Sequence, residues 1–406
     1  MKTDYDIIIS GGGLAGLTAA IIFAKHDFKT LCVDIQKTED ALNADNDGRT
    51  TAISYGSKQL LTLGGLWDGM AKDACPIKDI HIKDSSAPTL LTFLSKEVNG
   101  KTFGWIVDNL ELRQHLIRSA QKTKNLDHMD GTAATDFEFH NDYAAITTST
   151  GKRYTGKLLI GADGRNSTVR NALDISCKAW DYGQTAIVFM AYHDKPHDNI
   201  AVEHFRADGP FAILPMTDAP DSTHRSSVVW SEHGDSAFMN ASDTVFRAAV
   251  QERFGDYFGT VTKTSKRFAY PLRYMHADRY IGTRCALIAE AAHAMHPIAG
   301  QGLNMSLRDV AAIIELCHDA RAIGIDFGSP EILEKYERWR KKDNRMMGIA
   351  TDALNRLFSN KIPGVKALRN FGLELVRLTK PAKKMFMHQA MGQMGDLPSL
   401  IRGEKL

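Results

Sequence analysis

The stretch from 284 to 309 places an acidic side chain and a glycine-containing loop between an apolar run and a helix-like segment. The apolar run, 285–289, is short enough for a buried strand, and Glu290 follows it directly. The loop then contains Pro297, Gly300 and Gly302, and the helix-like segment begins near Leu303. Glycine lets the backbone approach a ligand closely, and the free N–H groups of a helix start favour negative charge. The pattern is typical of a site that holds a polar, partly anionic cofactor.

A second glycine-rich turn lies near the N-terminus. Its sequence fits GxGxxG, as Gly11-Gly12-Gly13-Leu14-Ala15-Gly16. It follows a strand-like run and opens a helix-like one. Asp34 lies 18 residues beyond its last glycine. In such a turn the first glycine makes the tight bend, the second admits a pyrophosphate and the third allows close helix packing. The acid can accept hydrogen bonds from an adenosine ribose. The segment predicts a dinucleotide site but does not separate NAD from FAD.

The third segment lies between these two. Asp163 and Gly164 follow the apolar run 158–160 and precede a helix-like stretch. Alone this would be an ordinary Asp-Gly turn. It indicates a cofactor site only because it lies between two other segments that combine a strand, an acid and glycines.

These segments need a doubly wound α/β scaffold. The runs 6–10, 14–26 and 30–34 read as strand, helix and strand, which is a βαβ unit. Further along the chain, the pattern predicts a loop and helix over 49–64 and strand-like alternation over 78–93. It then predicts a helix over 110–122 and a hairpin over 143–160. Short β-rich runs between about 180 and 268 predict an inserted antiparallel sheet. A long helix is expected over 303–322, and helices broken at Pro363 and Pro381 are expected from 330 onward.

The 406-residue chain therefore divides, by expectation, into three parts. A discontinuous cofactor domain takes 1–75, 100–180 and 268–330, a β-rich substrate domain takes 76–99 and 181–267, and a helical segment takes 331–406. The composition, 43% hydrophobic and 24% charged, is that of a soluble globular protein. Five scattered cysteines without a CxxC pair fit a reducing cytosol and disfavour a zinc site. The uncharged run 7–24 contains three adjacent glycines, so it reads as strand, turn and helix, and the chain is expected to be soluble or peripheral.

The C-terminal segment is basic. From 341 to 406 there are 13 Lys and Arg against five Asp and Glu, a net charge of +8, whereas the rest of the chain carries −6. With Met, Phe and Leu at helical spacing, this segment could meet an acidic partner or an anionic membrane surface. A solvated helical face explains the same pattern equally well.

The three segments, in this order, resemble the aromatic-ring hydroxylases, which are single-component flavoprotein monooxygenases. The resemblance covers nearly the whole chain and narrows to the ubiquinone-biosynthesis hydroxylases, of the 2-octaprenyl-6-methoxyphenol hydroxylase type. The motifs that carry it are DGRTTAIS at 47–54, Gly209-Pro210 with Leu214-Pro215, Tyr270-Pro271-Leu272, and HPIAGQGLN at 296–304 with LRD at 307–309.

The resemblance implies a Rossmann-like FAD-binding domain of the glutathione-reductase type and assigns roles to residues. Gly11, Gly13, Leu14, Ala15, Gly16 and Asp34 would hold the adenosine diphosphate half. Asp163 would lie by the pyrophosphate and Glu290 by the ribityl chain. Arg49, Asn109 and Arg113 would contact the cofactor on its substrate side. Pro297, Gly300, Gly302, Leu303 and Asn304 would surround the flavin ring.

One departure from the family pattern concerns the ribityl contact. The usual Gly-Asp is here Ala289-Glu290, which keeps a carboxylate but lengthens it by one methylene. Because the flanking 291–293 and the glycine loop are intact, FAD binding is expected to be retained.

The implied reaction uses NAD(P)H as a transient reductant, since no second GxGxxG with a βαβ context is present. Reduced FAD reacts with O2, and the resulting C4a-hydroperoxyflavin hydroxylates the ring of a polyprenylated phenol. The flavin carries the chemistry, so Pro297, His296 and Arg49 are the candidate catalytic residues only by their position. Phe205, Phe211 and Trp230 are candidates for covering the site against water.

Alternatives and further expectations stay open at this stage. A hydroxylase of a soluble aromatic acid would need a cation, for which Arg206 or Arg225 is available, and a non-catalytic FAD-binding subunit is a second rival. His293 and His296 lack a third ligand, so no metal is expected. The resemblance implies a cytoplasmic protein, peripheral at the inner face of the plasma membrane. It could contact other ubiquinone-biosynthesis proteins or form a homo-oligomer, and nucleic acid is not an expected partner.

Overall fold

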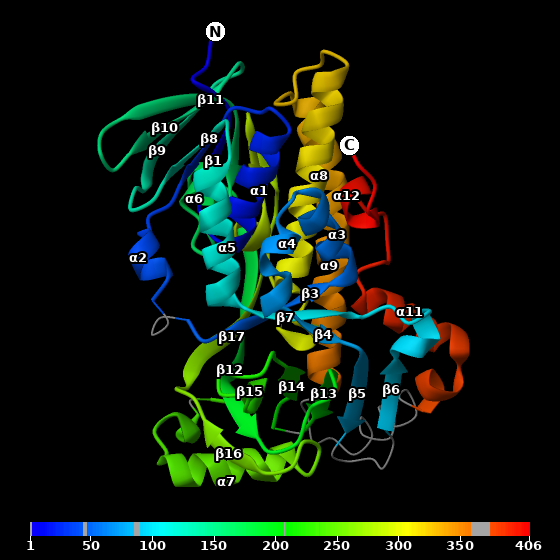
Figure 1. Ribbon diagram of the computed structural model, residues 1–406. Helices are drawn as coiled ribbons and strands as arrows, with labels where there is room; N and C mark the ends of the chain where they lie inside the picture. The colour runs from blue at the N-terminus through cyan, green and yellow to red at the C-terminus, as the bar shows by residue number, and fades with distance from the viewer. Residues whose placement is uncertain (1, 44–46, 85–89, 207, 235, 359–373) are drawn as a thin grey trace.

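The computed structural model describes residues 2–43, 47–84, 90–206, 208–234, 236–358 and 374–406. Figure 1 shows a parallel sheet with helices at one end of the molecule and a large, mostly antiparallel sheet at the other. A small third sheet and two long helices, α8 (Gln301–Ala322) and α9 (Pro330–Phe358), connect the two ends.

The first sheet has the order β18-β19-β11-β1-β2-β8, with the β9–β10 hairpin attached to β11. Its central strands pair in parallel, as the predicted βαβ unit requires. Helix α1 (Leu14–Lys25) is buried along most of its length, because its Ala and Ile side chains pack between the sheet and α8. The strands are β18 (Ile281–Gly282), β19 (Cys285–Leu287), β11 (Arg153–Gly161), β1 (Tyr5–Ser10), β2 (Thr30–Val33), β8 (Leu126–Met129), β9 (Ala134–Phe139) and β10 (Ala144–Thr148).

The second sheet confirms the predicted β-rich insertion. Its order is β20-β17-β12-β15-β14-β13-β5-β6, with β16 paired to β12, and helix α7 (Asp243–Phe254) packs on one face. The predicted boundary at 268 falls at the start of β17, which pairs with β12, so this strand belongs to the large sheet. The strands are β20 (His293–Ala294), β17 (Phe268–Ala277), β12 (Cys177–His193), β15 (His224–His233), β14 (Phe211–Pro215), β13 (Ile200–Phe205), β5 (Asp79–Asp84), β6 (Leu90–Leu94) and β16 (Val261–Thr264).

The third sheet, β3-β7-β4, lies between the other two. The segment expected to be a loop before a helix begins instead with strand β3, which pairs with β7. The strands are β3 (Thr50–Ser54), β7 (Gly104–Asp108) and β4 (Cys75–Ile77). The helices beside them are α2 (Thr38–Ala41), α3 (Tyr55–Leu63), α4 (Trp67–Met70), α5 (Asn109–Lys122) and α6 (Thr168–Ala172).

The segment 331–406 is not a separate appendage. Helix α9 packs along α8, and its Tyr336 and Leu333 lie in the core of the first sheet. Pro381 lies in the first turn of α11 (Lys380–Ala390), where its missing N–H is tolerated, and α12 (Ser399–Arg402) packs on α3. Pro363 lies outside the described residues. Within the described ranges, no helix combines the length and apolar character needed to cross a bilayer.

Candidate functional site

The turn between β1 and α1 has no room for a Cβ at Gly11 or Gly16 but is open at Gly13. Gly11 has φ +107°, and a Cβ on it would overlap the carbonyl oxygen of Ala162. A Cβ on Gly16 would overlap the carbonyl oxygen of Gly11, so α1 packs close to the strand. A Cβ on Gly13 would meet no atom of the described residues within 4 Å, and Gly13 caps α1 without a side-chain hydrogen bond. The helix therefore presents free N–H groups to open space, as an anion site requires.

Asp34 holds this turn from the end of β2. One carboxylate oxygen accepts the N–H of Gly12 at 2.7 Å, and the other accepts the N–H of Gln36 at 2.8 Å. A Cβ on Gly12 would lie 2.6 Å from the Asp34 carboxylate, so Gly12 is also required here, although the GxGxxG pattern leaves that position free. Each oxygen keeps a lone pair with which a ribose hydroxyl can be bound.

Asp163 has one satisfied and one unsatisfied oxygen. Its Oδ2 accepts the N–H groups of Thr168 at 2.7 Å and Val169 at 3.1 Å. Its Oδ1 is buried and has no hydrogen-bond partner within the part of the chain that the structure describes. A buried acceptor without a donor is costly, so this oxygen fits a group that the cofactor or its water would supply.

Arg49 lies beside the same site and is held by Asp47. Its Nε and Nη2 each lie 2.9 Å from an oxygen of Asp47, and its guanidinium lies 5.0 Å from the ring centre of Tyr270. Asp47 raises the pKa of Arg49, with smaller contributions from Tyr270 and Glu290. Asp47 and Tyr270 were not predicted as site residues, although both lie in the motifs that carried the resemblance.

Arg113 and Asn109 serve this arrangement differently from Arg49. Arg113 donates to the carbonyl of Ala41 at 2.8 Å and approaches Asp47 at 3.4 Å. Asn109 is buried, and its side-chain oxygen accepts from the hydroxyl of Thr51 at 2.5 Å. Both side chains therefore shape the wall of the site in this conformation.

Glu290 is exposed and faces a cation. Its carboxylate lies 3.3 Å from Nη2 of Arg165, and it belongs to the short helix η4 (Ala289–Ala291). The residue before it, Ala289, has φ +55°, a left-handed conformation that favours glycine. Ala289 therefore adopts a backbone conformation that suits the glycine of the family's Gly-Asp pattern, and Glu290 keeps the acid.

His296 is fully buried. Its Nε2 lies 3.2 Å from Oε1 of Gln184, and the N–H of Ile298 points at its Nδ1 at 3.4 Å. The first contact needs a proton on Nε2 and the second a free Nδ1, which together describe a neutral ring. Burial lowers the pKa of His296 to about 4, in agreement with that tautomer. The catalytic role of His296 stays a prediction, and its burial favours a positioning role next to the exposed Pro297.

The start of α8 resembles the start of α1. Gly300 has φ +59° and caps α8 without a side-chain bond, and a Cβ on Gly302 would find no described atom within 4 Å. Leu303 is partly buried against the main core. Asn304 is buried and joins this helix to β3, accepting from Ser54 N–H at 2.9 Å and donating to Ala52 carbonyl at 2.8 Å. The glycines thus leave the helix end accessible, while Asn304 fixes its direction.

The candidate cover residues lie on two different faces of the large sheet. Phe205 stacks on Phe358 of α9 at 3.9 Å, in an apolar cluster that we name the Ile298 cluster. Phe211 and Trp230 instead pack with α7 on the opposite face, so the expectation that they cover the site is wrong. The Ile298 cluster includes Met190, Phe205, Met216, Ile298, Phe358 and Met387.

The two candidate cations for an aromatic acid also separate. Arg206 pairs with Glu252 of α7 at 3.7 Å, away from the Ile298 cluster. Arg225 donates to the carbonyl of Thr217 at 2.8 Å. Burial raises the pKa of Asp108, and the positive charge of the nearby Arg225 partly offsets this rise.

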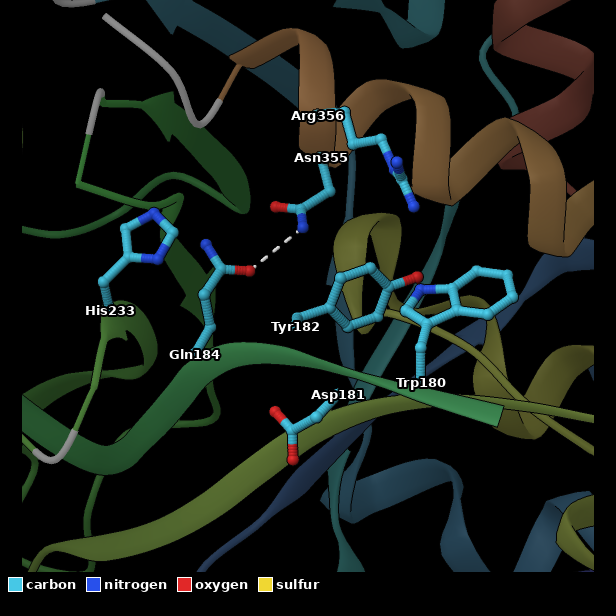
Figure 2. Close-up of a pocket in the computed structure, with 7 residues that line it drawn as sticks. All are labelled: Trp180, Asp181, Tyr182, Gln184, His233, Asn355 and Arg356. Atoms are coloured by element: carbon cyan, nitrogen blue, oxygen red, sulfur yellow. Dashed lines mark hydrogen bonds between the residues drawn. The ribbon is translucent and has the colours of Figure 1, made fainter. Parts of the chain in front are cut away.

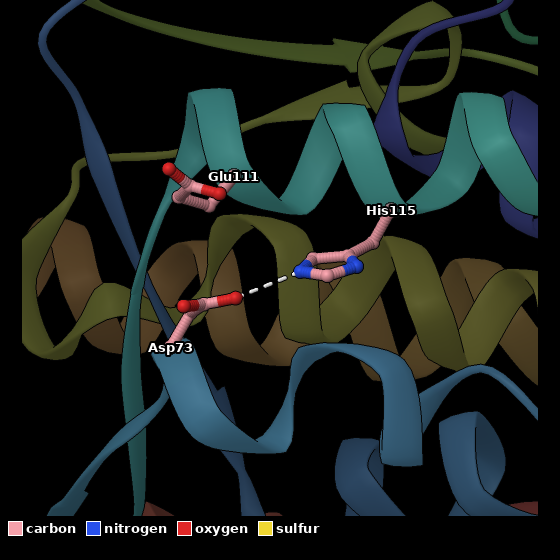
Figure 3. A group of neighbouring side chains, drawn as sticks. All are labelled: Asp73, Glu111 and His115. Atoms are coloured by element: carbon pink, nitrogen blue, oxygen red, sulfur yellow. Dashed lines mark hydrogen bonds and ion pairs between the residues drawn. The ribbon is translucent and has the colours of Figure 1, made fainter.

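One group of possible metal ligands lies elsewhere, on α5 and the short helix η1 (Ala71–Asp73). Figure 3 shows Asp73, Glu111 and His115, whose ligand atoms lie within 4.8 Å of one another. His115 Nε2 lies 2.8 Å from Asp73, as expected of a simple ion pair. The expectation that the protein binds no metal stays a prediction. Of the two histidines considered for a metal, His293 is hydrogen-bonded through Nε2 to Oδ2 of Asp309 at 2.6 Å.

Comparisons with known proteins agree with this geometry. The family model described as "FAD binding domain" matches residues 4–346. The chain is 39% identical to a protein named ubiquinone hydroxylase UbiL of Rhodospirillum rubrum, over 99% of this chain and 93% of that protein. It is 29% identical to 3-demethoxyubiquinol 3-hydroxylase of Escherichia coli, over 95% and 98%.

Solved structures show the same fold. The p-nitrophenol 4-monooxygenase PnpA of Pseudomonas putida superposes with a TM-score of 0.78 at 17% identity, covering 98% of this chain and all of that one. At that identity, the likeness concerns the fold alone.

Proposed function

The chain belongs to the FAD-binding family that includes the ubiquinone-biosynthesis hydroxylases, and from this membership we propose that it hydroxylates the aromatic ring of a polyprenylated phenol, using FAD, NAD(P)H and O2. Three observations support the proposal. The starts of α1 and α8 lack a side-chain cap, the buried Oδ1 of Asp163 has no partner among the described residues, and Glu290 pairs with Arg165.

The residues fit FAD in the way the family requires. Gly13 and the α1 N–H groups would hold the pyrophosphate, and Asp34 the adenosine ribose. Asp163 and Glu290 would take hydroxyl groups, and Gly300 and Gly302 would admit the flavin ring. When bound, FAD supplies hydride acceptance from NAD(P)H and activation of O2.

The protein's own task is to orient the ring and to exclude water. Pro297 is exposed between the start of α8 and the Ile298 cluster, so a ring that contacts Pro297 would lie against apolar side chains. His296 holds this loop from behind and stays neutral near pH 7. An apolar environment suits a phenol and would keep water away from reactive intermediates.

We also propose that the protein binds a membrane surface peripherally, because a prenyl tail partitions into lipid. Exposed apolar side chains lie in the basic C-terminal part, among them Leu375, Leu378, Met385 and Phe386, near the exposed Lys380 and Lys384. Apolar and basic side chains together favour an anionic bilayer. The location that follows from this proposal is the inner, cytoplasmic face of the plasma membrane.

Two measurements test the function. Quinone intermediates extracted from a deletion strain should include a precursor that lacks one ring hydroxyl, and the wild-type gene should remove it. The purified, FAD-loaded protein should consume NAD(P)H and O2 in the presence of that precursor. Normal quinone profiles, or an absence of flavin reduction with every phenol that accumulates, would favour the non-catalytic alternative.

A further inference from the structure

A cavity of about 210 Å³, partly open to solvent, lies where β12 is irregular (Figure 2). The register between β12 and β17 skips Tyr182 and Gly183, and Gly183 has φ +61°. This bulge turns the strand so that the side chains around it meet α9. The cavity is lined by Trp180, Asp181, Tyr182, Gln184, His233, Asn355 and Arg356.

Gln184 has only half of its amide satisfied. Its Oε1 accepts from Nδ2 of Asn355 at 3.0 Å and from Nε2 of His296 at 3.2 Å. Its Nε2 is buried and donates to no described atom, while the side chain as a whole is 2% exposed. An unsatisfied buried donor costs about 1–3 kcal/mol, so the cavity lacks a hydrogen-bond acceptor for Gln184. The hydroxyl of Tyr182, in the same lining, has no partner among the described atoms either.

The charges around the cavity indicate what kind of acceptor is missing. Asp181 pairs with Arg273 at 3.0 Å, and Arg356 pairs with Asp352 at 2.9 Å. Because these charges are balanced, the unmet group is a neutral donor, and its complement is a neutral oxygen such as a hydroxyl, methoxy or carbonyl group.

The size and one wall of the cavity indicate what carries that oxygen. Trp180 stacks on Tyr274 at 3.9 Å and remains 38% exposed, which offers a flat aromatic surface. The volume is below the range of roughly 300–1,000 Å³ that suits drug-sized ligands, so one ring fits and a whole prenylated molecule does not.

We propose that this cavity is a second ring site, in which Gln184 Nε2 donates to a ring oxygen of the phenolic substrate or of its quinone product as the ring passes between solvent and the flavin site. The ligand class rests on the proposed function. Since Gln184 also holds His296, which precedes Pro297, a ring in this cavity contacts the support of the flavin-side loop directly.

The test uses the FAD-loaded protein and two tail-less rings, 2-methoxyphenol for the substrate arm and 2,6-dimethoxybenzoquinone for the product arm. Tryptophan quenching that disappears in Trp180→Phe reports this cavity. Gln184→Met removes the donor. Gln184→Glu keeps the acceptor for His296 and Asn355 but, once ionised, has no proton to donate.

We expect Kd for whichever ring binds to rise about tenfold in Gln184→Met, and equally in Gln184→Glu at pH 8. At pH 5 the protonated carboxyl regains a donor, so Gln184→Glu should recover, whereas a purely structural role would give no such recovery. Gln121→Glu, the same change at an exposed position of α5, should bind as wild type.

The proposal is overturned if neither ring causes Trp180-dependent quenching, or if both Gln184 variants bind with wild-type affinity at pH 8. The binding measurement needs no turnover. Binding without any hydroxylation would therefore reject the proposed function, whereas hydroxylation without this binding would reject the second ring site alone.

Discussion

The carboxylate of Asp309 lies 2.6 Å from Nε2 of His293 and, through the same oxygen, accepts the N–H of Ala289 at 3.1 Å. Its other oxygen accepts from Nε of Arg340 at 2.8 Å and from Nδ2 of Asn344 at 2.9 Å. Asp309 and Arg340 are both completely buried. One carboxylate on α8 therefore joins the turn that carries Glu290 to helix α9.

Removing that charge should destabilise the protein strongly. In Asp309→Asn the buried Arg340 keeps Asp343 at 2.7 Å but loses its fully buried carboxylate partner, and breaking one side of a buried ion pair costs about 3–5 kcal/mol. Urea unfolding of the FAD-free protein measures this. Asp319→Asn, on the same helix but with an exposed carboxylate, should change the free energy of unfolding by less than about 0.5 kcal/mol. Similar effects for the two variants would contradict the role of Asp309.

The same carboxylate predicts a dependence on acid pH. Burial alone would raise the pKa of Asp309, but the charges of His293 and Arg340 lower it to about 2. A carboxyl whose pKa is lower in the folded state contributes stability above its unfolded value, near 3.9, and loses it as the pH falls towards 2. Asp309→Asn should lack this part of the acid transition.

Ala289→Gly should stabilise the fold. Ala289 has φ +55°, where a Cβ is unfavourable, so glycine should raise the free energy of unfolding by about 0.5–1 kcal/mol. Ala291→Gly, two residues on and without a positive φ, should lower it, because it only removes a buried methyl and adds backbone freedom. Denaturant titrations of both variants check the sign. Destabilisation by Ala289→Gly would mean that the methyl group contributes packing that outweighs the strain.

Glu290→Asp should leave FAD affinity unchanged or improve it, since the shorter acid restores the family pattern. Glu290→Ala should weaken FAD binding about tenfold, because a charged hydrogen-bond acceptor is lost beside Arg165. Titration of the apoprotein with FAD measures the FAD affinity of both variants. The matched control is Glu331→Asp, which makes the same change at an exposed side chain of α9. A large loss in Glu290→Asp would show that the longer acid has its own function.

His296 should influence stability rather than proton transfer. Burial lowers its pKa to about 4, so the folded state resists protonation and stability is lost as the pH falls below the unfolded value near 6.5. Between pH 7.5 and pH 5, His296→Gln should therefore lose about 2 kcal/mol less stability than wild type. Denaturant unfolding of both proteins at both pH values tests this. An equal loss of stability in wild type and His296→Gln would mean that another group takes up the proton.

Membrane binding should depend on the exposed apolar side chains of α11. Met385→Asp combined with Phe386→Asp should reduce flotation with vesicles that contain anionic lipid several-fold, because apolar burial and charge attraction both fall. Val245→Asp changes an equally exposed apolar side chain on α7 and should float as wild type. Equal flotation of all three proteins would reject the peripheral membrane proposal.

Local patterns in the sequence predicted the elements that bear the cofactor contacts. The helix expected over 303–322 is α8, and the helix expected over 110–122 is α5, because apolar periodicity marks both and Asp108 caps the second. The turn around Gly11 was equally predictable, since close backbone approach leaves glycine as the only choice.

Other features depend on contacts that a local pattern does not contain. Trp230 alternates correctly along β15, but only the position of α7 decides which face of the sheet it enters. The pairing of Arg340 with Asp309, 31 residues away, requires α9 to fold back along α8. The tautomer of His296, with its proton on Nε2, depends on Gln184, which lies more than 100 residues earlier in the chain.

Helix α9 is fastened near one end to Asp309 through Arg340, and near the other to Gln184 through Asn355. A chain that stopped at 340 would therefore lose Asn344 beside Asp309, Phe358 from the Ile298 cluster and Asn355 beside Gln184 together. The basic C-terminal part cannot be deleted as if it were a detachable anchor. A nonsense mutation there, or a protease cut within α9, should behave as a folding lesion and release FAD, even though it lies beyond every cofactor-binding motif.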